Sequence, residues 1–293
     1  MSQRPIILSL TSMQEIGLRI LREAGELRMA SALDPATLQR EAADAEALVV
    51  RTAGVIDAAL MDSAPRLKVI GRHGVGYDHI DVPAATARGI QVVYTPGANT
   101  ESVCQHTIAF LIAISKHFPQ QMAKLPIGRY NDRTKHVGRD LTGRTLGIIG
   151  FGRIGRRVGE VAYQAFGMRV LYNDIVPAPP EVEAKAAARR VGLDELLRES
   201  EYITLHVPLD ESTRRLINRD ALAKMRPDAI LVNTCRGPVV DEAAVAEALD
   251  AHRLWGYAAD VFEVEPPPPD HPLIGRPDCM LTPHSAAQTI ESL

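Results

Sequence analysis

The 293-residue chain contains 33 Lys and Arg against 36 Asp and Glu, a formal net charge of −3, and it is 46% hydrophobic and 24% charged. This balance is typical of a globular protein and excludes the basic footprint that nucleic acid or an acidic membrane surface requires. The three cysteines lie far apart without CxxC spacing and the apolar stretch near the N-terminus is short, so we expect a cytoplasmic, reduced protein without a disulfide framework, metal site or membrane span.

Short β-branched runs recur along the chain between helical patterns, which predicts an α/β protein with parallel sheets covered by helices on both faces. The predicted strands are residues 5–10, 47–52, 67–71, 90–95, 145–150, 168–174, 202–207, 229–234, 256–262 and 279–284. The apolar stretch 103–118 predicts a helix joining two sheets, and the polar stretch 128–145 predicts a loop. We expect a first domain of residues 1–98 and a second of residues 99–284, with residues 285–293 returning towards the first.

A glycine pattern, Gly150-x-Gly152-x-x-Gly155, follows one predicted strand and opens a helical pattern, as a dinucleotide-binding fold requires. Glycines permit a tight turn and close approach of the backbone to a pyrophosphate at the helix N-terminus. Asp174 stands 19 residues beyond Gly155, at the end of the next predicted strand, where a carboxylate binds the adenosine ribose. Because it would repel a 2′-phosphate and no arginine stands beside it in residues 173–180, we expect NAD rather than NADP. The alternative is an ordinary βα turn with Asp174 as a strand-end cap.

Four later strand ends are polar, namely residues 206–208, 233–237, 260–265 and 282–284. In doubly wound sheets, ligands bind at the carboxyl ends of the strands, so an arginine, two carboxylates and a histidine can meet in one crevice. Hydride transfer to a carbonyl needs such groups: an imidazolium to protonate the oxygen, a carboxylate to stabilise it and a guanidinium to bind a substrate carboxylate. By spacing alone, the arginine could equally be a surface ion-pair partner, Asp260 a turn cap and the histidine a surface or core residue.

Six stretches resemble, in order, the D-isomer-specific 2-hydroxyacid dehydrogenase family, which includes phosphoglycerate dehydrogenase, glyoxylate/hydroxypyruvate reductase and D-lactate dehydrogenase. They are residues 71–81, 143–158, 205–218, 233–245, 256–268 and 281–286. The resemblance implies two α/β lobes, a flavodoxin-like substrate-binding domain and an inserted Rossmann NAD-binding domain, with the site in the cleft. It implies a homodimeric oxidoreductase that transfers hydride between NAD(H) and a small D-2-hydroxy acid or 2-keto acid, such as 3-phosphoglycerate, glycerate and hydroxypyruvate, or glyoxylate.

The resemblance also implies roles for single residues. Arg236 would bind the substrate carboxylate and keto oxygen, and Glu265 would be the partner of His284, the acid/base catalyst. Further substrate-binding residues would be Val75 and Gly76, through backbone N–H groups, and Arg51 and Arg72, unless these arginines are only exposed strand-end charges. Besides the three glycines and Asp174, the cofactor would contact Arg153, Ile154, His206, Val207, Pro208, Thr213, Thr234, Cys235 and Asp260, the last through the nicotinamide carboxamide.

Residues 260–265 hold three carboxylates, and a run of four prolines, residues 266–269, follows them. Such a run is often an extended spacer, but it directly follows a predicted strand, so we expect it to stiffen the loop that holds Glu265 near His284. His271, in the same loop, is the rival histidine, and we interpret it as a turn residue.

Two alternatives stay open. A non-enzymatic NAD-sensing protein of the same fold can retain these residues, and phosphite-oxidising relatives share the stretch 256–263 but carry lysine where this chain has Val75. Formate dehydrogenases carry glutamine where Glu265 stands, which argues against formate. The chain departs from the family pattern soon after His284, where the family commonly continues into a further long helix.

Overall fold

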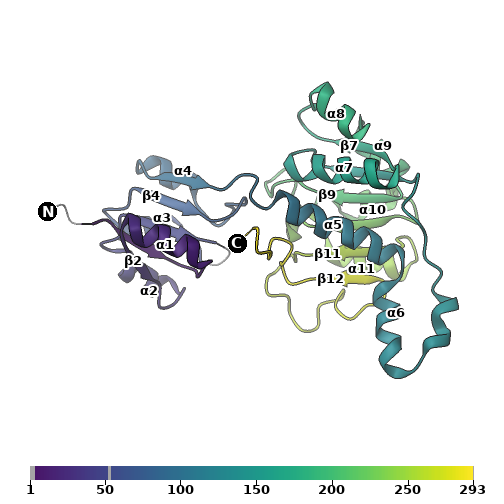
Figure 1. Ribbon diagram of the computed structural model, residues 1–293, viewed down its shortest axis with the longest axis horizontal. Helices are drawn as coiled ribbons and strands as arrows, with labels where there is room; N and C mark the ends of the chain where they lie inside the picture. The colour runs from purple at the N-terminus through teal and green to yellow at the C-terminus, as the bar shows by residue number, and fades with distance from the viewer. Residues whose placement is uncertain (1–3, 52–53, 293) are drawn as a thin grey trace. The chain divides into compact units, whose positions relative to one another are not determined.

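The computed structural model describes residues 4–51 and 54–292, which divide into two compact units (Figure 1). Unit 1 comprises Met1–Asn99 with Ser292–Leu293, and unit 2 comprises Thr100–Glu291. Residues 285–291 cluster with unit 2, and the return of residues 285–293 towards the first domain stays a prediction. Ser292 donates a hydrogen bond to the carbonyl of Ala98 in unit 1. Leu293 and Thr52, which fall within two sequence-based predictions, lie outside the described residues.

Unit 1 is built on a five-stranded parallel sheet with the order β2-β1-β3-β4-β5, which is the flavodoxin-like order. Its core packs helices α2, α3 and α4 against the sheet, whereas α1 buries none of its residues. Helices α2, α3 and α4 each begin after an aspartate whose carboxylate caps the first turn. The elements are β1 (Ile6–Ser9), α1 (Glu15–Ala24), β2 (Glu26–Met29), α2 (Pro35–Ala42), β3 (Ala47–Val50), α3 (Ala58–Ser63), β4 (Val69–Arg72), α4 (Val82–Ala87) and β5 (Gln91–Tyr94).

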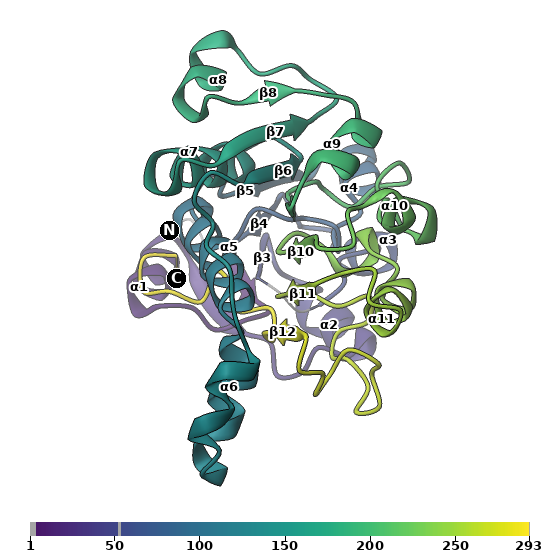
Figure 2. The same cartoon turned by 90° about the vertical axis from the view of Figure 1, so that its right-hand side faces the viewer.

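Unit 2 contains a seven-stranded parallel sheet with the order β12-β11-β10-β9-β6-β7-β8. Numbered from β6, the order from the β8 edge is 3-2-1-4-5-6-7, the Rossmann order with one added strand. Figure 2 shows these strands running from β8 at the top to β12 at the bottom. The strands are β6 (Thr145–Ile149), β7 (Arg169–Asn173), β8 (Arg189–Arg190), β9 (Tyr202–Leu205), β10 (Ile230–Asn233), β11 (Gly256–Ala259) and β12 (Cys279–Leu281).

The helices of unit 2 cover both faces of this sheet. One face packs against α5 and α7 and the other against α9, α10 and α11, as Figure 2 shows. Helix α6 and two short 3-10 helices, Leu125–Ile127 and Tyr130–Lys135, form an arm that stands away from the sheet (Figures 1 and 2). The helices are α5 (Thr100–Ser115), α6 (Phe118–Lys124), α7 (Arg153–Phe166), α8 (Pro180–Ala186), α9 (Leu193–Glu199), α10 (Arg219–Lys224) and α11 (Glu242–Asp250). Within the described residues, every helix is too short or too polar to span a lipid bilayer.

The predicted fold class is confirmed, and all ten predicted strands occur with bounds shifted by a few residues. Two strands, β2 and β8, were missed, and a 3-10 helix forms inside the stretch that we predicted to be a loop. Both missed strands lie at a sheet edge and are largely exposed, so they lack the apolar run that marks a strand buried on both faces.

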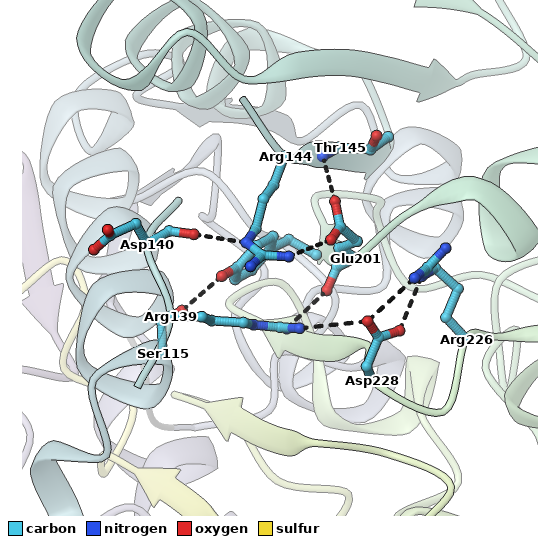
Figure 3. Close-up of polar contacts among 9 residues, drawn as sticks. Ser115, Arg139, Asp140, Arg144, Thr145, Glu201, Arg226 and Asp228 are labelled. Atoms are coloured by element: carbon cyan, nitrogen blue, oxygen red, sulfur yellow. Dashed lines mark hydrogen bonds and ion pairs between the residues drawn. The ribbon is translucent and has the colours of Figure 1, made fainter. Parts of the chain in front are cut away.

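A cluster of polar side chains lies at the end of the unit 2 sheet where its strands begin (Figure 3). The Arg139 side chain is only 9% exposed and stacks over the rings of Tyr202 and Trp255, with its Cζ atom 4.7 and 4.9 Å from the ring centroids. Its Nη2 donates to the carbonyl oxygen of Glu201 at 3.3 Å, and its Nη1 lies 3.8 Å from the carboxylate of Asp228. The cluster therefore stabilises the amino ends of the strands, whereas a doubly wound sheet binds ligands at their carboxyl ends.

Candidate functional site

The glycine loop between β6 and α7 is shaped to receive a bound group. Gly150 has φ 91°, and a Cβ there would lie 2.5 Å from the carbonyl oxygen of His206, so only glycine fits this turn. At Gly152, the N-cap of α7, no described residue beyond the adjoining stretch of chain places a heavy atom within 4 Å of the position that a Cβ would take. The N–H groups of the first turn, which include those of Arg153 and Ile154, have no partner within the helix. The loop thus combines open space with backbone donors, as a pyrophosphate requires.

Asp174 follows β7 and lies beside this loop. Its Oδ2 accepts a hydrogen bond from the Phe151 N–H at 2.6 Å, and its Oδ1 accepts from the Val176 N–H at 3.0 Å. No arginine stands beside it in residues 173–180, as the sequence shows, but the more distant Arg190 of β8 donates to the carbonyl oxygen of Asp174 at 2.8 Å. We missed Arg190 because β8 was not recognised, so nothing in the sequence indicated that these residues pair.

The chain leaving β9 packs against the same glycine loop. Both ring nitrogens of His206 are buried without a hydrogen-bond partner among the described residues. Burial lowers the pKa of His206 to about 3, so the ring is neutral at physiological pH. In the loop that follows, Thr213 Oγ1 donates to the carbonyl oxygen of Pro208 at 2.7 Å, and Val207 packs on the core. A buried ring without a partner fits a site that a bound cofactor completes.

The end of β10 carries Thr234, Cys235 and Arg236. Thr234 is buried, and its Oγ1 lies 3.0 Å from Thr107 Oγ1 on α5. Burial raises the pKa of the Cys235 thiol to about 11, which excludes it as a thiolate nucleophile near neutral pH. Arg236 Nη1 donates to the carbonyl oxygen of Cys235 at 2.7 Å.

Glu265 and His284 are in contact, although 19 residues separate them. His284 Nδ1 lies 2.7 Å from Glu265 Oε2, and the Phe262 N–H donates to Glu265 Oε1 at 3.1 Å. Burial raises the pKa of Glu265, but the hydrogen bonds from His284 and Phe262 and the charge of Arg236 outweigh burial, so the net pKa is lowered. Because an ionised carboxylate can only accept, Nδ1 carries the hydrogen, which leaves Nε2 to exchange a proton.

The positive charge of Arg236, which follows β10, also lowers the pKa of the Glu265 carboxyl. The backbone that follows Arg236 packs closely against the loop that bears Glu265, since a Cβ on Gly237 would lie 1.8 Å from the carbonyl oxygen of Phe262. Glu265 and His284 border a largely apolar pocket of about 660 Å³, which is lined by residues of the Pro-rich loop, α6 and β12.

Asp260 anchors the turn that carries His284. The residue is 1% exposed, and its carboxylate accepts from the Ser285 N–H at 2.7 Å, the Ala286 N–H at 2.8 Å and Thr282 Oγ1 at 2.5 Å. Its carbonyl oxygen accepts from the His284 N–H at 2.8 Å, and His284 has φ 50°, a conformation that is costly for a residue with a Cβ. The structure therefore shows Asp260 fixing the backbone of His284, and its predicted contact with the carboxamide stays a prediction.

His271, the rival histidine, pairs with a residue that we had not singled out. Its Nε2 lies 2.9 Å from Glu242 Oε2 at the start of α11, and the side chains are 8% and 6% exposed. His271 Nδ1 accepts from the Leu273 N–H, so Nε2 carries the hydrogen. Glu242 also accepts from the Glu263 N–H at 3.1 Å. This buried pair holds the loop that bears Glu265, and no local pattern indicated Glu242.

The predicted substrate-binding residues of the first domain lie in unit 1. Val75 and Gly76 belong to the loop after β4, and no described residue accepts a hydrogen bond from either N–H. The guanidinium of Arg72 is bonded to this loop itself, through the carbonyl oxygens of His73 and Gly76. Arg51 is half-buried at the end of β3, and burial lowers its pKa. Arg72 therefore shapes the loop, and substrate binding by either arginine stays a prediction.

Comparison with known proteins identifies this arrangement. Residues 108–286, more than half of the chain, match the model of the D-isomer specific 2-hydroxyacid dehydrogenase, NAD binding domain. The chain belongs to the D-isomer specific 2-hydroxyacid dehydrogenase family. The predicted family and the NAD cofactor are thereby confirmed.

The relatives of this dehydrogenase family member differ in length. It is 41% identical over 288 residues to a D-3-phosphoglycerate dehydrogenase of Methanocaldococcus jannaschii, covering 98% of this chain and 54% of that protein. It is 38% identical over 277 residues to a hydroxypyruvate reductase of Thermotoga maritima, covering 94% and 89%. The solved D-lactate dehydrogenase of Aquifex aeolicus, complexed with NAD and lactic acid, aligns with a TM-score of 0.87 and 30% identity, covering 98% and 90%. The chain spans about half the length of the D-3-phosphoglycerate dehydrogenases it matches.

Proposed function

We propose that this chain is an NAD-dependent dehydrogenase that interconverts a small 2-keto acid and its D-2-hydroxy acid. The observation that carries the proposal is the 2.7 Å contact between His284 Nδ1 and Glu265 Oε2, beside the positive charge of Arg236. Family membership and the glycine loop at the start of α7 support the same reading. A non-enzymatic NAD-binding protein of this fold can retain the same residues, so turnover of a keto acid distinguishes the two functions.

The proposed mechanism uses these side chains as follows. The bound cofactor supplies the hydride that adds to the carbonyl carbon of the keto acid. Arg236 binds the substrate carboxylate with its fork of N–H donors. Protonated His284 gives the Nε2 proton to the carbonyl oxygen, where negative charge develops, and Glu265 stabilises the imidazolium through Nδ1. In the reverse direction Nε2 accepts the hydroxyl proton, so one residue serves both directions.

Asp260 and the glycine loop would support this chemistry from the cofactor side. We propose that the N–H groups of Arg153 and Ile154 bind the pyrophosphate, that Asp174 binds the adenosine ribose and that His206 finds its missing partner in the bound cofactor. In unit 1, the N–H groups of Val75 and Gly76 are proposed as further donors to the substrate carboxylate.

A panel of keto acids tests the proposal. NADH oxidation, followed by absorbance, should proceed with at least one of glyoxylate, hydroxypyruvate, pyruvate and 3-phosphohydroxypyruvate, which are the classes suggested by the family and by the relatives' names. His284→Ala should abolish most turnover, by about 10²–10⁴-fold, while NADH still binds. Tight NADH binding without turnover of any keto acid would instead identify an NAD-sensing protein.

We also propose that the chain forms a homodimer through unit 2. The arm from α6 to residue 137 exposes six large apolar side chains, as expected of a surface that another copy covers: Phe118, Met122, Leu125, Ile127, Tyr130 and Val137. Light scattering during size-exclusion chromatography should give twice the chain mass, and Met122→Lys with Ile127→Lys should shift it towards one chain. A cytoplasmic location stays a prediction, which fractionation of cells would test.

A further inference from the structure

Arg190 reaches the place where Asp174 is proposed to bind the adenosine ribose. It is the second residue of β8, and its Cα pairs with that of Tyr172 on the neighbouring strand β7. Its Nη2 donates to the carbonyl oxygens of Asp174 at 2.8 Å and Ile175 at 3.4 Å. A guanidinium therefore sits at the carboxyl end of β7, within the turn that presents the Asp174 carboxylate.

The chemistry of this position matches a 2′-phosphate. A guanidinium binds phosphate through parallel N–H donors, and an arginine near the ribose acid is the usual means of accommodating NADP. Both hydrogen bonds of Arg190 use Nη2, and a guanidinium has five N–H donors, so the group can hold these carbonyls and a phosphate together. Two backbone N–H groups already bind the Asp174 carboxylate, which partly offsets its repulsion of an anion.

The preceding residue shows that this placement is specific. Successive side chains of a strand point to opposite faces, so Arg189 points away from Arg190. Arg189 forms ion pairs with Glu195 at 2.9 Å and Glu199 at 3.7 Å. Each arginine carries one positive charge on the same short strand, but only Arg190 contacts the turn at Asp174.

We propose that Arg190 is a specificity-determining residue that binds the 2′-phosphate of NADPH, so that the chain accepts both NADPH and NADH. Asp174 favours NADH and Arg190 favours NADPH, and the balance between the two charges sets the preference. This inference rests on the proposed function, because it places the cofactor ribose at Asp174.

The test is a direct binding titration, independent of turnover. Cofactor fluorescence would give the Kd of NADH and of NADPH for the wild type, Arg190→Ala and Arg189→Ala. We expect wild-type NADPH binding to be measurable, and Arg190→Ala to weaken it by about 10- to 100-fold, as for the loss of hydrogen bonds to a charged group. The Kd of NADH should change by less than about threefold in both variants, since NADH has no 2′-phosphate. Arg189→Ala, the matched control, should leave both values unchanged.

Three results would overturn the inference: no NADPH binding by the wild type, equal weakening of both cofactors in Arg190→Ala, or equal loss of NADPH binding in the two arginine variants. Arg190→Lys should recover part of the NADPH affinity, because it restores the charge without the fork. A wild-type chain that binds neither cofactor would instead refute the proposed function, so the two failures are distinguishable.

Discussion

Gly237 offers a sharp test of the idea that backbone packing sets the geometry of the site. A Cβ at this position would lie 1.8 Å from the carbonyl oxygen of Phe262 and 2.4 Å from the Glu263 nitrogen. Real Cβ contacts essentially never fall below 3.0 Å, so Gly237→Ala must separate the two backbones by at least 1.2 Å, the difference between 3.0 and 1.8 Å. The atoms displaced are backbone atoms, which cannot rotate away as a side chain could.

This separation moves Arg236 relative to the loop that bears Glu265. A misplacement of about 1 Å can cost about 10²-fold in rate, so we expect kcat to fall by about that factor. NADH affinity should fall less than kcat does, because the glycine loop before α7 is not touched. The overpacking should also destabilise the protein by about 1–3 kcal/mol, which calorimetry can measure.

Gly192→Ala is the matched control. Gly192 has φ −67°, and among the described residues none apart from its chain neighbours has a heavy atom within 4 Å of the added Cβ, so this variant should keep its kcat. Stopped-flow measurement of kcat, NADH titration and thermal unfolding would be made on both variants. An unchanged kcat in Gly237→Ala would refute the reasoning, and so would an equal fall in both variants.

Three further predictions concern charge and burial. Glu265→Gln should move the loss of reductive activity to lower pH in a pH–rate profile, because an amide stabilises imidazolium less than a carboxylate does. Folding lowers the pKa of Glu265, so the ionised side chain stabilises the protein above pH 4.5, its ordinary pKa, and this stabilisation is lost in more acidic solution. The free energies of unfolding of Glu265→Gln and of the wild type, measured in urea, should therefore become equal at acidic pH. Arg139→Ala removes a buried guanidinium that packs on two aromatic rings, so it should cost about 2 kcal/mol and lower Tm by about 4–8 °C. Arg226→Ala, the control, breaks a half-exposed ion pair and should cost less than about 1 kcal/mol. His271→Ala should lower kcat and stability together by leaving Glu242 buried without its partner, and a stable, fully active variant would contradict a positioning role.

Local sequence patterns were enough for the strands buried on both faces, because such strands need continuous apolar runs. They were also enough for the glycine turn, since the positive φ at Gly150 and the contact with the His206 carbonyl leave no room for another side chain. The resemblance then supplied Glu265 and His284 as partners, which spacing alone had left open. Local sequence patterns and the resemblance were therefore enough to predict the fold class and the family.

The tertiary structure decided which distant side chains meet. Edge strand β8 has no apolar run, yet it brings Arg190 to the turn at Asp174, and the proposed binding of a 2′-phosphate rests on this contact. Glu242 became the partner of His271 only because α11 begins beside the Pro-rich loop. Arg72 donates a hydrogen bond to the loop that follows β4, a contact that depends on how the chain turns there. Periodicity and spacing describe neighbours along the chain, whereas these contacts are set by how the packed elements bring remote segments together.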